Sequence, residues 1–268
     1  ELSTKTKIKL GKLYWSDYKI VKLRNEDITI RKLDERQEQK EATKSIISSE
    51  ENTSNKILDR LLRQNKYNII LEITKDYKKK NDRTTSLIRA KCHGKLGNHV
   101  EAIRELKKAA VYNKEMDIIY HEIGLNEIQL MRTNKGIEYL ERSLLINSEN
   151  KEARYELSKA LVRTKDYAAA EDNLRLLIRQ DKNYFKGYVE LAKSLMNCNL
   201  YGEAIQSLIS CLDKAPTYSE AWMMMGIINE RIGNYKEAIY NYRQVLSINH
   251  RNIFAIIIAQ ADTFLRLL

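Results

Sequence analysis

The sequence contains few histidines and none of the common catalytic motifs. Only four histidines occur among its 268 residues, and none lies four positions from another on a helix, which is the spacing of a metal-binding pair. The sequence also has no glycine-rich phosphate loop and no nucleophile elbow. These absences favour a protein that is not an enzyme and that uses no cofactor, no metal and no small-molecule substrate.

Cysteine is also scarce, and its three positions show no paired spacing: Cys92, Cys198 and Cys211. Paired or clustered cysteines would indicate disulfides or a metal site. Each of the three falls at a helical position of the pattern described below. We therefore interpret all three as buried small apolar residues in a reducing compartment, which predicts a cytoplasmic protein.

Long apolar runs are missing as well. No run of eighteen apolar residues occurs, so the sequence predicts no membrane span, and no signal peptide is visible. The chain begins at Glu1 without an initiator Met, and the apolar segment 253–268 has the pattern of another helix rather than of a polar cap. We expect a fragment of a longer polypeptide whose helical array continues beyond Leu268, because a repeat array needs polar caps at its ends.

A strict 34-residue period is the strongest feature that is present. Small residues recur in one frame at Ala102, Gly136, Ala170, Ala204 and Ala238. Two further columns keep the same register, one of Leu106, Leu140, Leu174, Leu208 and Tyr242, the other of Ala90, Gly124, Ser158, Ala192 and Gly226. Two antiparallel helices with their turns take about 34 residues, and each helix needs one small residue where the backbones approach. The period therefore predicts a stack of helical hairpins.

The repeat resembles the tetratricopeptide repeat family. Residues 219–252 carry the residues of that family's pattern at the expected spacing, namely Trp222, Gly226, Gly233, Tyr235, Ala238 and Tyr242. Pro216, the single proline, lies where the family often ends a second helix, because proline stops a helix. The resemblance implies an all-α, right-handed superhelical solenoid. Five full units follow in one register, at 83–116, 117–150, 151–184, 185–218 and 219–252.

The flanking segments match the pattern less well. Residues 51–82 have the pattern of a degenerate repeat, and 253–268 that of a partial one, so that the predicted solenoid spans 51–268. Residues 1–50 form a charged N-terminal extension without the small-residue frame, in which we expect a hairpin at 18–31 and a helix from Lys32 to about Ile47. We expect this extension to order against the solenoid or another subunit.

Three positions within the units depart from the family pattern. Arg89 and Arg154 stand at positions that are usually apolar or aromatic, and Thr133 replaces the tyrosine of the turn. The period continues through all three, so the fold prediction is unchanged. We expect the unit that contains Thr133 to pack less regularly at its turn.

Charge points to a binding surface. The formal net charge is +11, with 47 Lys and Arg against 36 Asp and Glu, and the simplest interpretation is a solvated basic surface. In the family the inner face of the superhelix comes from the first helix of each unit, and here the corresponding residues have a basic centre with Glu152, Glu220 and Glu230 around it. The predicted partner-binding residues are Lys91, Lys95, His121, Leu125, Tyr155, Lys159, Arg163, Val189, Lys193, Asn197, Met223, Ile227 and Arg231.

These residues lead to a functional hypothesis of a scaffold that binds other protein subunits. A basic, tyrosine-bearing face suits an acidic peptide segment, with apolar contacts from Leu125, Val189, Met223 and Ile227. Reversing the charges of Lys159 and Lys193 should then weaken capture of the partner. A ciliary or cytoskeletal assembly is preferred, because a long uncapped array suggests subunits packed at both ends. The alternative is an RNA- or ribosome-associated helical-repeat protein that binds nucleic acid through its basic surface.

Overall fold

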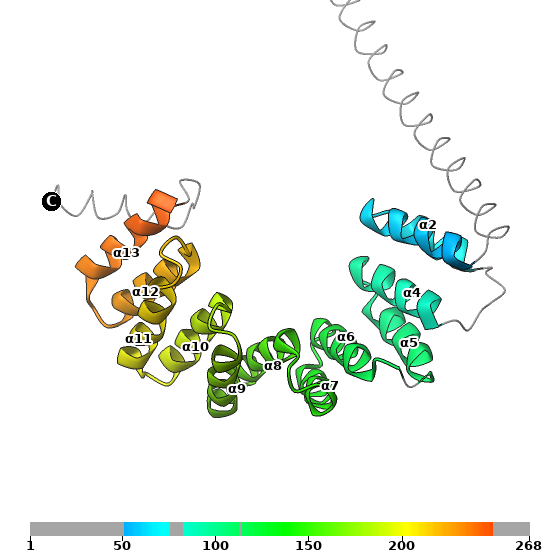
Figure 1. Ribbon diagram of the computed structural model, residues 1–268. Coiled ribbons are helices and arrows are strands. Elements are labelled where there is room, and N and C mark those ends of the chain that lie inside the picture. Colours follow the sequence, from blue (N-terminus) through cyan, green and yellow to red (C-terminus); the bar gives the residue numbers. More distant parts are fainter. Residues whose placement is uncertain (1–50, 76–82, 113, 249–268) are drawn as a thin grey trace, which may run out of the picture. The chain divides into compact units, whose positions relative to one another are not determined.

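The fold of the described residues is entirely helical (Figure 1). The computed structural model describes residues 51–75, 83–112 and 114–248, and every regular element in these ranges is an α-helix. The all-α prediction is therefore confirmed. The predicted extension at 1–50, with its hairpin and helix, and the partial repeat at 253–268 lie outside the described residues and stay predictions.

The chain divides into two compact units, the first ending at Gly97 and the second beginning at Asn98. This boundary lies inside the repeat predicted at 83–116. The described helices of the first unit are α2 (Glu51–Arg63), α3 (Tyr67–Lys75) and α4 (Arg83–Lys95). Their core is made of Leu58, Leu61, Ile70, Ile73, Ile88 and Cys92. In this unit Arg89 extends from α4 to α3, where its Nη1 donates to Thr74 Oγ1 at 3.1 Å.

The second unit is a run of helices in which each described helix packs against the next (Figure 1). Its helices are α5 (His99–Ala110), α6 (Met116–Gln129), α7 (Thr133–Ile146), α8 (Lys151–Thr164), α9 (Tyr167–Gln180), α10 (Phe185–Asn197), α11 (Tyr201–Leu212), α12 (Ser219–Arg231) and α13 (Tyr235–Ile248). From α6 onward the even-numbered helices are the first helices of their hairpins, and these also pack directly, α6 on α8, α8 on α10 and α10 on α12. The first helices therefore share one continuous layer.

The turn inside each repeat has the same backbone conformation. Positions are counted from the first residue of each 34-residue unit. The residue at position 15 adopts a left-handed conformation in all five units, with φ between 60° and 84°: Gly97, Met131, Lys165, Asn199 and Gly233. A left-handed residue is the common way to end a helix, and glycine adopts it without steric cost. Only two of the five are glycine, so packing between the helices holds the other three turns in place. The unit with Thr133 keeps this turn conformation, and α7 begins at Thr133 itself.

Small residues bring the helices of a hairpin together, as the period predicts. A Cβ atom added to Gly124 on α6 would lie 3.0 Å from the Gly136 carbonyl oxygen on α7, and one added to Gly136 would lie 2.9 Å from the Gly124 carbonyl oxygen. The two backbones thus meet at these two glycines. Helix starts are also encoded locally, since the side chains of Asn150 and Asp166 accept hydrogen bonds from Ala153 N and Ala169 N.

A recurring hydrogen bond joins each of three repeats to the loop before it. The side chain at position 4 of the unit donates to the carbonyl oxygen six residues earlier. The three bonds run from Arg154 Nη2 to Ser148 at 2.6 Å, from Tyr188 Oη to Lys182 at 3.2 Å and from Trp222 Nε1 to Pro216 at 2.8 Å. Arginine, tyrosine and tryptophan each bring a donor to this carbonyl, which explains why Arg154 occupies a position that is usually aromatic.

The cysteine prediction is correct at two positions and wrong at the third. Cys92 and Cys211 are fully buried, and burial raises the pKa of each thiol to about 11. Cys198 is exposed, because it caps the C-terminal end of α10 instead of lying within the helix. Among the described helices none is both long and apolar enough to cross a membrane.

Candidate partner-binding surface

The residues predicted to bind a partner lie on the first helices of the hairpins, at positions 5, 9 and 13 of each unit. Residues four apart share one face of a helix, and the neighbouring first helices of the second unit are in contact. Eleven of the thirteen residues are therefore brought together on α6, α8, α10 and α12, where all are exposed or half-buried. We call them the first-helix surface: His121, Leu125, Tyr155, Lys159, Arg163, Val189, Lys193, Asn197, Met223, Ile227 and Arg231.

The remaining two predicted residues, Lys91 and Lys95, lie on α4 in the first unit, where both are exposed. They share one face of that helix, since they are four residues apart. They belong to a different unit from the other eleven, so the first-helix surface is defined without them.

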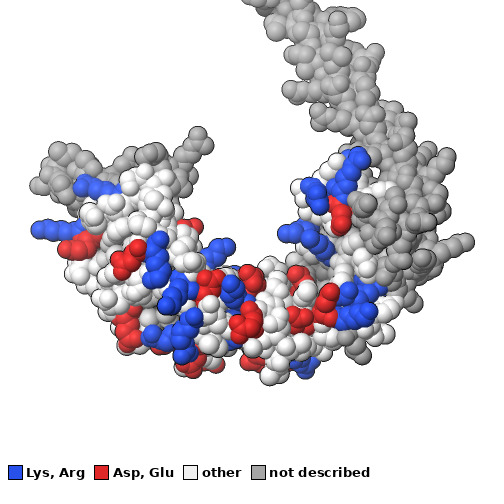
Figure 2. Space-filling model, viewed as in Figure 1, with Lys and Arg blue, Asp and Glu red and all other residues white. Residues whose placement is uncertain are grey.

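The charges at the centre of the first-helix surface are paired. Lys159 Nζ lies 3.0 Å from Glu156 Oε2, and Lys193 Nζ lies 3.3 Å from Glu190 Oε1, in each case one turn earlier on the same helix. Figure 2 shows basic and acidic side chains interspersed over the visible face. The expectation of a basic centre therefore needs revision, because the glutamates at position 6 neutralise the lysines at position 9.

Cations without an ion pair remain at the C-terminal ends of the first helices. Within residues 98–248 of the described chain, neither Arg163 nor Arg231 has a salt bridge, although Arg163 Nη2 approaches Met131 Sδ at 3.9 Å. At the opposite ends of the same helices lie the carboxylates of Glu152 and Glu220. Acidic first turns and basic last turns complement the helix dipole, so part of this distribution stabilises the helices themselves.

An aromatic pocket that the sequence analysis missed adjoins this surface. It has a volume of about 460 Å³ and lies where α8, α10 and the start of α12 meet, lined by Glu152, Tyr155, Glu156, Asn183, Tyr184, Phe185, Lys186 and Tyr218. The rings of Tyr155 and Tyr184 are 5.5 Å apart, and those of Phe185 and Tyr218 are 5.8 Å apart. A signal was present in the sequence, because Tyr184 and Tyr218 end two consecutive units and are 34 residues apart. We call these residues the tyrosine pocket.

Burial and negative charge keep the pocket tyrosines protonated. Burial, followed by the charges of Glu152 and Glu156, raises the pKa of Tyr184 to about 12. Burial, followed by the charge of Glu220, raises the pKa of Tyr218 to about 12. The pKa of Tyr155 is raised as well, first by burial and then by Glu190 and Glu156. At neutral pH the three hydroxyl groups are therefore neutral and can both donate and accept hydrogen bonds.

A larger cavity lies among the second helices. It measures about 1020 Å³ and is lined by residues of α9, α10 and α11, with Leu176, Ile178, Leu191 and Leu195 among them. Arg175 spans its edge, since its guanidinium bonds Glu171 on α9 at 2.7 Å and Glu203 on α11 at 2.9 Å. This salt bridge joins the two second helices beside the cavity.

The fold defines a class of protein, and comparison with known proteins identifies the type of repeat. Hairpins of helices with a 34-residue period define an α-helical repeat solenoid. Tetratricopeptide repeat family models match residues 122–184 and 219–252. These parts of the chain therefore match tetratricopeptide repeats, as the resemblance in the sequence predicted.

Individual relatives cover the chain in part. A Drosophila melanogaster protein, the BBSome complex member BBS4 homolog, is 27% identical over 166 residues, which are 58% of this chain and 34% of the relative. The chain thus spans about a third of that protein's length.

Solved structures agree on the fold. The structure of MamA 41-end from Desulfovibrio magneticus RS-1 has a TM-score of 0.58 at 17% identity, covering 64% of this chain and 97% of that one. YrrB, described as a TPR protein with an unusual peptide-binding site, has a TM-score of 0.54 at 16% identity, covering 71% of this chain and 97% of YrrB. These similarities confirm the predicted solenoid architecture.

Proposed function

We propose that this protein is a non-catalytic scaffold that binds another protein through its first-helix surface within a larger assembly. The observation that carries the proposal is the surface itself, in which half-buried Leu125, Val189, Met223 and Ile227 lie on contacting helices beside charged side chains. Apolar side chains of this kind supply affinity, while the charges around them set register and specificity. The match of residues 122–184 and 219–252 to tetratricopeptide repeats supports a role in protein interaction.

The proposed assembly is ciliary or cytoskeletal, and the BBSome is its first candidate. The support is the name of the Drosophila relative, which describes a member of that complex. The proposal places the protein in the cytoplasm, where free thiols persist. All three of its cysteines are free.

The partner segment is proposed to be acidic where it passes Arg163 and Arg231. Both guanidinium groups are exposed at the ends of their helices, whereas Lys159 and Lys193 are already paired with glutamates. An acidic segment can therefore be attracted by the arginines without first breaking an internal salt bridge.

Affinity capture of the full-length protein from its own cells, with crosslinking mass spectrometry, tests this function. We expect protein partners that persist after nuclease treatment and that crosslink close to the first-helix surface. Partners that disappear with nuclease would favour the RNA-associated alternative instead. Recovery of no BBSome subunit would leave the scaffold function standing and reject that assembly.

A double charge reversal tests whether the partner binds to the first-helix surface rather than to another face of the solenoid. Arg163→Glu with Arg231→Glu should reduce capture of the partner about tenfold, because two attractive contacts become repulsive. Arg179→Glu is the matched control, since Arg179 is an exposed arginine in the last turn of a second helix, α9. Loss of capture in the control alone would move the interface to the second helices.

A further inference from the structure

The tyrosine pocket has features of a binding site that its structural role does not explain. Three tyrosines and one phenylalanine come together from two successive repeats, 151–184 and 185–218, and they line most of a pocket of about 460 Å³. The rings pack against the core from outside and are only partly buried. Side chains needed solely for packing would fill this space, whereas here ring faces and hydroxyl groups line a cavity.

The hydroxyl groups of the pocket are available to a ligand. In the part of the chain that the structure describes, Tyr155, Tyr184 and Tyr218 make no hydrogen bond through their hydroxyl groups. Other buried tyrosines do use theirs, since Tyr188 donates to the Lys182 carbonyl and Tyr242 donates to Glu230. The difference indicates that the three pocket hydroxyls face water or a ligand.

The charge of the pocket favours a cation. Two carboxylates, Glu152 and Glu156, line it; Glu156 is paired with Lys159, whereas Glu152 has no ion pair among the described residues. The aromatic rings add to this preference, because the face of a tyrosine ring attracts cations. Lys159 makes such a contact, since its ammonium group lies 5.2 Å from the centre of the Tyr155 ring.

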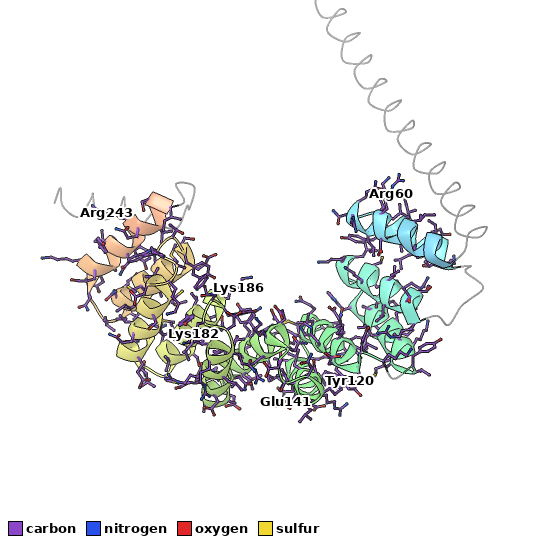
Figure 3. The ribbon with its side chains drawn as sticks, in the orientation of Figure 1. Arg60, Tyr120, Glu141, Lys182, Lys186 and Arg243 are labelled. Atoms are coloured by element: carbon purple, nitrogen blue, oxygen red, sulfur yellow. The ribbon has the colours of Figure 1, made fainter. Side chains whose placement is uncertain are left out.

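Two cations reduce this preference, namely Lys159, which is paired with Glu156, and Lys186. Lys186, in the first turn of α10 and labelled in Figure 3, also lines the pocket. Its side chain is exposed and forms no salt bridge with any described residue. Because a lysine on a flexible stem can turn toward water, Lys186 does not prevent a bound cation from pairing with Glu152.

We propose that the tyrosine pocket binds the cationic side chain of a partner protein, with arginine preferred over lysine. A planar guanidinium can stack on the ring faces, donate to the tyrosine hydroxyls and pair with Glu152 at the same time. The proposal rests on the proposed function, since it names the chemistry of the partner at one end of the first-helix surface. The bound partner segment then places its arginine beside the N-terminal ends of α8 and α10, and its acidic residues near Arg163.

Short blocked peptides test the pocket without knowledge of the partner. The probes are four acetylated, amidated tripeptides of the form Gly-X-Gly, in which X is Arg, Lys, Phe or Glu. They are titrated to about 10 mM, since one side chain is expected to bind with a millimolar Kd, against the full chain labelled with carbon-13 in its tyrosine rings. The signals of Tyr155, Tyr184 and Tyr218 are assigned with single Tyr→Phe variants.

We expect the arginine peptide to shift all three ring signals saturably and the lysine peptide to bind more weakly. Glu152→Gln should weaken binding of the arginine peptide about two- to fivefold, the range expected for one exposed charge pair. The matched control is Glu122→Gln on α6, because Glu122 is also an exposed carboxylate on a first helix but lies outside the pocket. The control should leave binding unchanged.

Other outcomes would overturn the proposal. Saturable shifts with the phenylalanine peptide that survive Glu152→Gln would define an apolar pocket, and preferential binding of the glutamate peptide would define an anionic one. No shift with any probe would mean that the pocket is not a binding site. The scaffold function is judged separately, because capture that depends on Arg163 and Arg231 can succeed while every tripeptide fails, and the reverse result would keep the pocket but reject the first-helix surface.

Discussion

At the scale of single residues, Arg154 shows how a residue outside the family pattern can perform the role of the residue it replaces. Its side chain is only 7% exposed, and burial lowers its pKa while the charge of Glu149 opposes this change. Its guanidinium binds the Ser148 carbonyl and Asn173 Oδ1. The aromatic residues of the next two repeats donate to the equivalent carbonyls. A hydrogen-bond donor that reaches this carbonyl is thus the common requirement of the position.

The requirement predicts opposite results for two substitutions of Arg154. Arg154→Ala should lower the free energy of unfolding by about 2–4 kcal/mol, because it leaves a cavity and removes the guanidinium bonds to Ser148 and Asn173. Arg154→Tyr should stay within about 1 kcal/mol of the original protein, because Tyr188 shows that a tyrosine makes the same bond and a buried charge is removed. Urea unfolding followed by circular dichroism measures both. Equal stability of the alanine variant would show that the hydrogen bond contributes nothing.

At the scale of elements, the contact between the two helices of a hairpin depends on complementary sizes at positions 8 and 24. The last described hairpin has Gly226 on α12 opposite Tyr242 on α13, and a Cβ atom on Gly226 would lie 2.5 Å from the tyrosine ring. The preceding hairpin has Ala192 and Leu208 at the same two positions, both fully buried. Between these two hairpins, the larger ring at position 24 is thus accompanied by the smaller residue at position 8.

This matching predicts strong coupling between the two positions. Gly226→Ala alone should destabilise the protein by about 1–3 kcal/mol through overpacking. Combined with Tyr242→Leu, which reproduces the pair of the preceding hairpin, the same substitution should cost at least about 1 kcal/mol less. Unfolding free energies of the two single variants and the double variant give the coupling. Strictly additive values would mean that the ring and the glycine do not determine the contact.

At the scale of the whole molecule, every shifted pKa among the described tyrosines and cysteines is raised above its ordinary value. Burial is the largest cause of the raised pKa of Tyr184, Tyr218, Tyr242, Cys92 and Cys211. The folded protein therefore holds protons that the unfolded chain loses between about pH 9 and pH 12. Stability is complete below this range and falls as the pH rises through it, because the folded state binds more protons.

The expected slope is at least about 1 kcal/mol per pH unit above pH 10, since a difference of one bound proton corresponds to about 1.4 kcal/mol per unit. Urea midpoints measured between pH 8 and pH 11 check this value. Tyr242→Phe should reduce the slope, because it removes one buried group that titrates in the range. A midpoint that does not change up to pH 11 would contradict the assigned pKa directions.

The helical repeat could be predicted from the sequence because its cause is local. The period of small and large residues, the capping Asn150 and Asp166, and the turns at position 15 all depend on residues within one hairpin. A repeat needs only its own two helices and its neighbours, so the period alone determined the fold class. For the same reason the exposed positions of the first helices could be assigned from their spacing.

Contacts made by long side chains were decided only by the tertiary structure. The pairing of Lys159 with Glu156 depends on the conformations of two long side chains. The pattern of equivalent positions in successive repeats does not describe these conformations. The tyrosine pocket needs rings from two successive repeats, and Tyr184 and Tyr218 belong to loops rather than to the periodic helix faces. The sequence by itself thus determined the architecture, because spacing along a helix is fixed by backbone geometry. The chemistry of the surface was determined by packing between repeats, because that packing selects which side chains meet.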